Sequence, residues 1–330
     1  MRRRKSRPAR RQRSALADAK RRFVLSVSIP AALYASIGLF TLGWAFVLMF
    51  FKYSPGRAGG PILGLGGSNP FVGLEHFGNM IDGVSLEARL FRTSLKNTLI
   101  FAFAVLPLNL AITLPLAALI ESIRSRWKTG FRAVYFLPVL TASVGVAMMW
   151  GYLYDPQAGF FNAVIRQLGG TPIAWLSDPR AEFLGVSVSM WAVIGAYLWA
   201  DYGFNLVIFI AALQAIPHEF KEAAVVDGAN AWQVFTRVTI PLLRPTILFV
   251  CVMTMISSFQ VFDIIQVMTD GGPNNQTRVL VLDIYQNAFR YQRMGWASAI
   301  AFVLVLIVMG ITIVQMRLLR TEWELSLIHI

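Results

Sequence analysis

Long apolar stretches alternate with short charged ones along the whole chain, and their length is the clearest structural signal in the sequence. A helix needs about 20 residues to cross a hydrocarbon layer of roughly 30 Å. Apolar stretches of that length predict spanning helices, because a helix satisfies its own backbone hydrogen bonds inside a membrane. We expect six of them, at residues 23–51, 98–120, 133–154, 184–216, 246–268 and 296–317.

The fourth stretch, 184–216, is longer than one perpendicular crossing requires, so part of it is expected to tilt or to project into water. None of the six shows the alternation of apolar and polar residues that predicts an exposed strand. The pattern therefore predicts an all-α polytopic membrane protein, with residues 23–317 forming one transmembrane domain.

The composition supports a membrane protein, because 56% of the residues are hydrophobic and only 14% are charged. A water-soluble enzyme does not fit these proportions. The single cysteine, Cys251, lies inside an apolar stretch, so the chain has neither an internal disulfide nor a pair of cysteines for a metal.

The distribution of lysine and arginine predicts which side of the membrane each loop occupies. Of the 30 basic residues, 20 lie before the first stretch, in loops 121–132 and 217–245, or after residue 316. The positive-inside rule therefore places both termini and loop 217–245 in the cytoplasm. Residues 1–22 are expected to be a retained basic tail that anchors this topology, with binding of anionic lipid or a regulator as the alternative. Residues 318–330 are expected to form a cytoplasmic C-terminal tail.

Loop 217–245 is unusually amphipathic for a connection between two apolar stretches. Apolar residues recur at helical spacing on both sides of Asp227-Gly228, around Phe220 and around Trp232. The spacing predicts two short helices joined by a turn that glycine permits. Two interpretations remain open: these helices tuck under the bundle at the membrane surface, or they present a knob to a partner.

The residues of this loop resemble the EAA loop of binding-protein-dependent ABC importer permeases. The resemblance rests on Glu222-Ala223-Ala224, on Gly228, and on the ending Val238-Thr239-Ile240-Pro241, where the commoner ending is I-x-L-P. It extends over roughly 133–275 and is similar to the carbohydrate-uptake branch of the family. It implies the type I importer permease fold and a coupling helix seated in the cleft of a separate ATPase. The implied coupling residues are Glu222, Ala223, Ala224, Asp227, Gly228 and Pro241.

The resemblance also implies an assembly in a prokaryotic cell (inner) membrane. Its parts would be this chain, a second permease in a heterodimer, two ATPase subunits that bind ATP and Mg, and an extracytoplasmic solute-binding protein. This chain would hold no cofactor or metal and no catalytic residue, and it lacks the G-x-x-x-x-G-K-[ST] loop that holds ATP phosphates. Despite the net charge of +13, no nucleic-acid partner is expected, because the excess lies in a tail beside the membrane.

Two carboxylates, Asp201 and Asp263, lie inside predicted spans. A charge at the centre of a bilayer costs ~2.5–3.5 kcal/mol, so Asp201 should face a partner or a watery cavity. Amides, carboxylates and aromatic faces suit a sugar, whereas the alternative role is helix–helix hydrogen bonding worth about 0.6–2 kcal/mol per contact. Asp263 could instead brace the loop that follows the fifth span. The solute-pathway candidates, from these residues and the positions that line the solute site in the family, are Tyr197, Ala200, Asp201, Asn205, Phe259, Gln260 and Asp263.

The sequence thus predicts the permease subunit of an ATP-driven ABC importer for a sugar, preferably a di- or oligosaccharide. A glycerol-3-phosphate-like solute is an alternative, because arginines of the outer loops could attract phosphate. A proton-coupled secondary transporter could use Asp201 and Asp263 as a relay, but such proteins usually contain two repeated halves, and no repeat is visible here. A membrane-embedded enzyme is weaker still, for want of a nucleophile or metal cluster.

Overall fold

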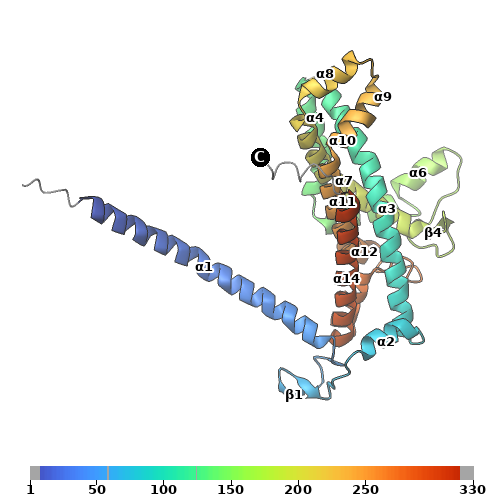
Figure 1. The fold of residues 1–330 in the computed structure, drawn as a ribbon. Coiled ribbons are helices and arrows are strands. Elements are labelled where there is room, and N and C mark those ends of the chain that lie inside the picture. The colour runs from blue at the N-terminus through green and yellow to red at the C-terminus, as the bar shows by residue number, and fades with distance from the viewer. Residues whose placement is uncertain (1–7, 58, 124, 320–330) are drawn as a thin grey trace, which may run out of the picture.

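Helices make up most of the chain in this computed structural model, which describes residues 8–57, 59–123 and 125–319. The long helices are α1 (Pro8–Leu48), α3 (Leu86–Ser122), α7 (Val188–Ala215), α11 (Arg244–Phe259), which α12 (Asp263–Met268) extends, and α14 (Met294–Leu319). Within the described residues these are the five helical spans long and apolar enough to cross a membrane. Helices α3, α7, α11 and α14 run side by side as a bundle (Figure 1).

The remaining elements are short and occupy the connections. They are β1 (Gly59–Ile62), β2 (Leu65–Gly67), α2 (Glu75–Asp82), α4 (Ser125–Phe136), the 3-10 helix η1 (Leu137–Leu140), α5 (Ser143–Leu153), α6 (Phe160–Gln167), β3 (Glu182–Phe183), β4 (Val186–Ser187), α8 (His218–Val226), α9 (Ala231–Val234), the π-helix η2 (Phe235–Thr239), α10 (Ile240–Leu242), α13 (Leu280–Tyr285) and the π-helix η3 (Gln286–Arg290). Helices α8 and α9 lie at one end of the bundle, and β1 and α2 lie at the opposite end (Figure 1).

The third expected span, 133–154, is not a continuous helix. The helical segments Trp127–Leu140 and Ser143–Leu153 meet at an angle of 97°. Pro138 explains where the first part ends: proline lacks an N–H, and its ring disfavours helical geometry at the preceding residue. The α-helix accordingly stops at Phe136. The expected number of six spans is reached only if this bent pair is counted as one of them.

Two antiparallel hairpins interrupt the otherwise helical chain. Strand β1 pairs with β2, and β3 pairs with β4. The second hairpin occupies the start of the fourth expected span, 184–216, so the prediction of a helix from residue 184 was wrong. Helix α7 begins at Val188 because Ser187 caps it, with the Ser187 Oγ accepting a hydrogen bond from the backbone N–H of Met190 at 3.3 Å.

The other expected spans have the right position but different ends. The stretch 98–120 lies inside α3, which starts twelve residues earlier, and 246–268 is divided by a break after Phe259. Helix α1 begins at Pro8, so the expected basic tail is helical from that residue on, while residues 1–7 and 320–330 lie outside the described part of the chain.

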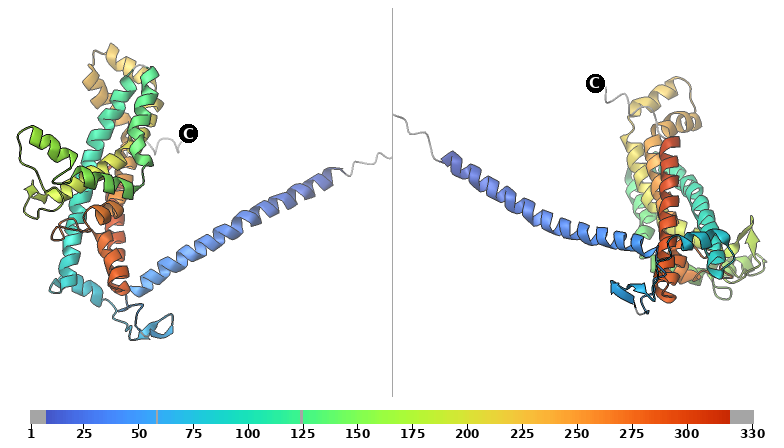
Figure 2. Two further views of the ribbon diagram at one scale, coloured as in Figure 1. Left: turned by 180° about the vertical axis from the view of Figure 1, so that it is seen from behind. Right: turned by 60° about the horizontal axis from the view of Figure 1, so that its bottom comes forward.

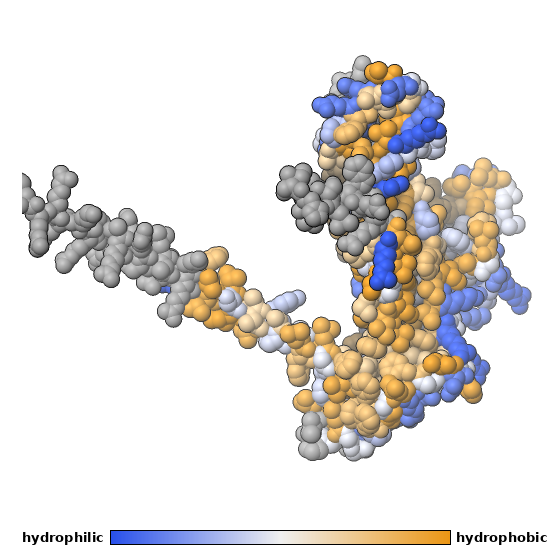
Figure 3. Space-filling view, viewed as in Figure 1, coloured by the Kyte–Doolittle hydropathy of each residue, from blue (hydrophilic) through white to orange (hydrophobic). Residues whose placement is uncertain are grey.

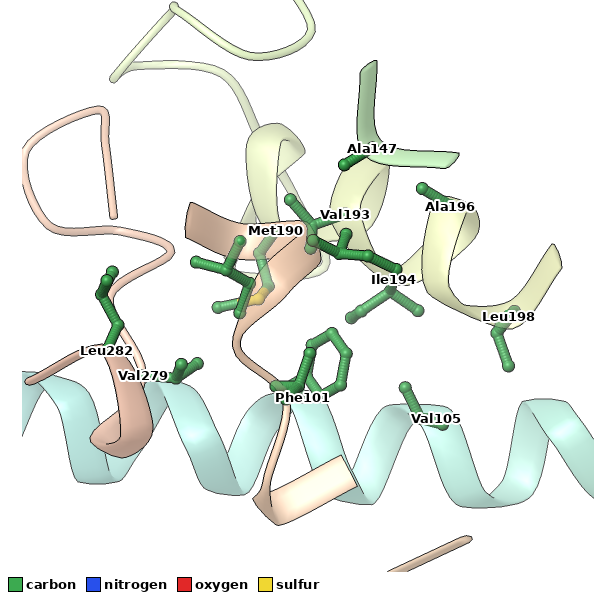
Figure 4. Close-up of a cluster of buried hydrophobic side chains, with 13 residues drawn as sticks. Phe101, Val105, Ala147, Met190, Val193, Ile194, Ala196, Leu198, Val279 and Leu282 are labelled. Carbon is green, nitrogen blue, oxygen red and sulfur yellow. The ribbon is translucent and has the colours of Figure 1, made fainter. Parts of the chain in front are cut away.

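Apolar clusters between the helices hold the bundle together. In the largest, Phe101 of α3 points toward Met190 and Ile194 of α7 (Figure 4). Lipid is as apolar as these side chains, so inside a membrane such contacts stabilise the fold by close packing more than by removal from water. Helices α7 and α4 approach closely at Gly203 of α7, where an added Cβ would lie 2.5 Å from the carbonyl oxygen of Tyr135. Only glycine lets the two backbones approach this closely.

Helix α1 stands apart from the bundle in all three views (Figures 1 and 2). It contacts α14 near its C-terminal end, where the rings of Phe46 and Phe302 lie 5.7 Å apart. Large apolar side chains from Phe23 onward are exposed along it, and apolar residues also cover much of the side of the bundle (Figure 3).

Candidate functional site

The 217–245 segment forms a projecting turn at one end of the bundle, beyond the C-terminal end of α7 (Figure 1). Helix α8 buries none of its residues, and polar and apolar side chains are interspersed over this end (Figure 3). Val226 is 86% exposed and Trp232 is 71% exposed, with the Trp232 ring 6.0 Å from that of Phe235. The structure thus contains the two predicted helices, and in this chain they project outward and do not tuck under the bundle.

The turn between α8 and α9 depends on a glycine. Gly228 has a φ of +85°, in the left-handed region that side chains resist. The backbone N–H of Gly228 donates to Val225 O at 3.0 Å, and that of Ala229 donates to Ala224 O at 2.9 Å. These bonds close the end of α8 in the manner of a left-handed cap. A Cβ at Gly228 would meet nothing within 4 Å, so within this chain the requirement is conformational and not steric.

A capping box starts the second helix. The Asn230 Oδ1 accepts from the Gln233 backbone N–H at 2.9 Å, and the Gln233 Oε1 accepts from the Asn230 backbone N–H at 2.8 Å. Together these bonds satisfy two N–H groups that a helix start leaves free. Sequence reasoning missed this pair, although an asparagine followed three residues later by glutamine is a known signal for a helix start.

The implied coupling residues divide between the tip and the base of the segment. Glu222, Ala223 and Asp227 are exposed on or beside α8, whereas Ala224 is partly buried. Pro241 lies in the short helix α10, partly buried at the base. The base is anchored, because the neighbouring Leu243 is fully buried in an apolar cluster with residues of α3 and α7.

An ion-pair cluster joins three helices near this segment. The Glu121 carboxylate, at the end of α3, accepts from Lys128 Nζ at 2.8 Å and from Arg132 Nη2 at 3.0 Å, both on α4. It also accepts from Gln214 Nε2 at 3.3 Å, at the end of α7 and just before α8 begins. Sequence reasoning missed Glu121, and the available signal was a single acid at the end of an apolar stretch followed by basic residues.

The polar residues of the spans meet in one network across α3, α7 and α11. The Asp201 Oδ2 accepts from Asn109 Nδ2 at 3.0 Å and from Asn205 Nδ2 at 3.4 Å. Asn205 Nδ2 also lies 3.0 Å from Asn109 Oδ1 and 3.0 Å from Thr254 Oγ1. Asn109, Asn205 and Thr254 are buried, whereas Asp201 is half-buried. The network braces the three helices, and only Asp201 keeps part of its carboxylate toward open space.

Tyr197 lies one turn from this network, and Ala200 directly precedes Asp201. The Tyr197 hydroxyl donates to Ser257 Oγ at 3.0 Å, and its ring contacts that of Phe101. Ala200 is half-buried beside Asp201. Asn109 and Thr254 belong to the same layer but were not singled out from the sequence; the signal for them was a polar residue inside an apolar stretch.

The other three candidates surround the break between α11 and α12. Phe259 is fully buried in an apolar cluster, so its ring faces protein in this structure. Gln260 is exposed at the break itself. Asp263 is also exposed, and its Oδ2 accepts from the Ser143 Oγ of α5 at 2.7 Å. Asp263 therefore braces α12 against α5, and no hydrogen bond joins it to Asp201 within the described residues.

Comparison with known proteins identifies the family. Residues 114–320 match the family described as binding-protein-dependent transport system inner membrane component. An alpha-glucoside transport system permease protein of Rhizobium meliloti is 34% identical over 261 residues, which cover 77% of this chain and 73% of that protein. An sn-glycerol-3-phosphate transport system permease protein of Agrobacterium fabrum is 32% identical over 251 residues, which cover 76% of this chain and 81% of that protein.

The fold is also similar to that of a chain in the crystal structure of a bacterial ABC transporter involved in the import of the acidic polysaccharide alginate. The TM-score is 0.74 at 22% identity, and the match covers 93% of this chain and 98% of that chain. The chain therefore belongs to the family of binding-protein-dependent transport system inner membrane components, the membrane-spanning permease subunits of ABC transporters.

Proposed function

We propose that this chain forms half of the translocation pathway of an ATP-driven importer and that its solute is a sugar, a di- or oligosaccharide. The observation that carries the proposal is the projecting 217–245 segment, whose exposed α8 and Gly228 turn have the shape of a knob for a partner. A separate ATPase subunit would receive this knob, and ATP and Mg would bind there. The permease itself performs no bond chemistry, and it alternates access to the solute as the ATPases close.

The proposed orientation puts both termini and the 217–245 segment in the cytoplasm of a prokaryotic cell with the chain in its inner or plasma membrane. The excess of lysine and arginine on that side supports this orientation. A second permease, two ATPase subunits and an extracytoplasmic solute-binding protein would complete the assembly. The solute-binding protein would then dock at the end of the bundle that carries β1 and α2.

The names of the relatives support a sugar, and three arginines of the outer loops are not free to attract a phosphate. Two arginines that could attract a phosphate are already paired: Arg290 with Asp270 and Arg293 with Glu87. A third, Arg278, is buried against Asp283. Glycerol-3-phosphate remains the second candidate because a relative transports it. The separate hydrogen-bond partners of Asp201 and Asp263 do not favour a proton relay.

The test of this function is the substitution Glu222→Ala in the whole assembly. A carboxylate on the knob would pair with a basic group of the ATPase cleft, and leaving that group unpaired should weaken the complex about five- to 150-fold. We expect reduced solute uptake and less ATPase recovered with the purified permease, at unchanged membrane abundance. The matched control is Glu182→Ala, another exposed glutamate, in the β3–β4 hairpin away from the segment. Wild-type uptake and ATPase recovery in Glu222→Ala would remove Glu222 from the coupling role.

A further inference from the structure

A polar cavity of about 380 Å³ lies at the end of the bundle opposite to the 217–245 segment. The segment that follows α1, helix α2, and the starts of α3 and α14 supply its walls. Its charged lining consists of Lys52, Arg57, Glu75, Glu87 and Arg293, with His76 between them. None of the coupling and solute-pathway candidates named from the sequence lines this cavity.

The walls are held in place by contacts that involve the backbone. The backbone N–H of Gly295 donates to Tyr53 O at 3.2 Å, and an added Cβ at Gly295 would lie only 1.9 Å from Phe51 O. The buried His76 lies with its Nε2 3.1 Å from the same Phe51 oxygen, and its ring meets Trp296 edge to face at 5.7 Å. The chain after α1 is thus fixed against both α14 and α2, and the cavity is preformed.

The lining offers unpaired charges of both signs. Arg293 and Glu87 pair with each other across the cavity. Lys52, Arg57 and Glu75 form no ion pair or side-chain hydrogen bond with any other residue in the part of the chain that the structure describes. Two cations and one carboxylate therefore face a common space. A ligand with an anionic group and a cationic group separated by a few bonds would match them.

The cavity lies where two spans leave the membrane. Lys52 comes four residues after the span that ends at Leu48, and Arg293 directly precedes the span that begins at Met294. Aromatic rings gather at the same level, with Phe46 5.6 Å from Phe50 and Phe50 6.5 Å from Phe71. Basic residues and aromatic rings at the ends of spans mark the depth of the lipid headgroups.

We propose that this cavity binds the zwitterionic headgroup of a phospholipid, that of a phosphatidylethanolamine. The phosphate would lie against Lys52 and Arg57, and the ammonium would lie against Glu75. The acyl chains would run along the apolar surface of α1 and α14, which meet beside the cavity. Phosphatidylethanolamine, phosphatidylglycerol and inorganic phosphate all carry a phosphate group. Only phosphatidylethanolamine also supplies an ammonium group for the Glu75 carboxylate.

The experiment uses the full chain in nanodiscs that contain equal amounts of phosphatidylethanolamine and phosphatidylglycerol. Lipids that stay bound on extraction are counted by native mass spectrometry, with and without inorganic phosphate. The wild type should retain phosphatidylethanolamine in preference to phosphatidylglycerol. The double variant Lys52→Gln, Arg57→Gln should retain about 25-fold less, since each cation near a phosphate contributes about fivefold. Glu75→Gln should lose the preference between the two lipids.

The control Arg180→Gln removes an exposed arginine that does not line the cavity, and it should retain lipid as the wild type does. Equal retention of the two lipids by the wild type would overturn the zwitterion proposal without the need for any variant. Full displacement of lipid by millimolar phosphate would show a site for a free anion and would overturn it too. Retention in the double variant equal to that of the wild type would place the bound lipid elsewhere on the chain.

Discussion

Replacing Gly228 tests whether the turn between α8 and α9 is needed for its shape or for a close approach to a partner. At a φ of +85° a residue with a Cβ pays about 1–2 kcal/mol, and a β-branched residue is a stronger outlier. No atom of this chain lies within 4 Å of the added Cβ, so no steric term adds to that cost. The correctly formed turn should therefore become about 5- to 30-fold less populated in Gly228→Val.

The size of this effect predicts a specific set of results. The strain is confined to an exposed turn, so the membrane abundance of Gly228→Val should equal that of the wild type. Solute-stimulated ATP hydrolysis by the assembly should fall by a similar factor, about 5- to 30-fold, because it requires the knob in its seated shape. Gly228→Ala should lie between the two, and Gly228→Asn should be the mildest, since asparagine tolerates the left-handed region best among these side chains.

Gly169 provides the matched control. It has a φ of +79°, it also has nothing within 4 Å of an added Cβ, and it follows α6, away from the 217–245 segment. Gly169→Val should carry the same conformational cost and leave ATP hydrolysis coupled to solute. If Gly228→Asn is as inactive as Gly228→Val, the requirement is a close approach by a partner and the conformational argument is wrong. Normal coupling in Gly228→Val would refute both explanations.

Three further substitutions test other parts of the structure. Asp201→Asn should weaken uptake by no more than about 30-fold, because asparagine keeps an accepting oxygen for the network and such contacts are worth about 0.6–2 kcal/mol. Uptake in proteoliposomes with clamped ATP should be unaffected by an uncoupler. A dead variant together with uncoupler-sensitive wild-type uptake would favour a proton relay. Glu121→Gln removes the charge that ties α3 to α4, at a cost of about 1 kcal/mol, and should lower the ATP hydrolysis that solute stimulates. The control Asp270→Asn, which breaks an ion pair at the other end of the bundle, should not lower it. Equal behaviour of the two variants would contradict a role of Glu121 in coupling. Gly203→Ala should lower the free energy of unfolding of the purified chain by about 1–3 kcal/mol through overpacking. The control Gly130→Ala, with open space around the added Cβ, should not lower it. Equal melting temperatures of the two variants would contradict the close approach of α7 and α4.

The sequence by itself determined the membrane class, the approximate position of most spans and the shape of the 217–245 segment. Each of these depends on local features. The bilayer demands about 20 apolar residues from any spanning helix, whatever its neighbours are. The Asp227-Gly228 turn is likewise local, because a glycine after a short helix supplies the left-handed residue that ends it.

Only the tertiary structure decided which polar groups meet and which face space. Asn109 and Asp201 are 92 residues apart in the chain, and they meet because α3 packs along α7. Packing of α11 against α3, α13 and α14 buries Phe259, which its sequence position alone left available to a solute. The third expected span gave no sign of its 97° bend, which lies where η1 packs against α7. Hydropathy and periodicity describe one helix at a time, whereas hydrogen-bond partners, burial and bends depend on how the helices pair.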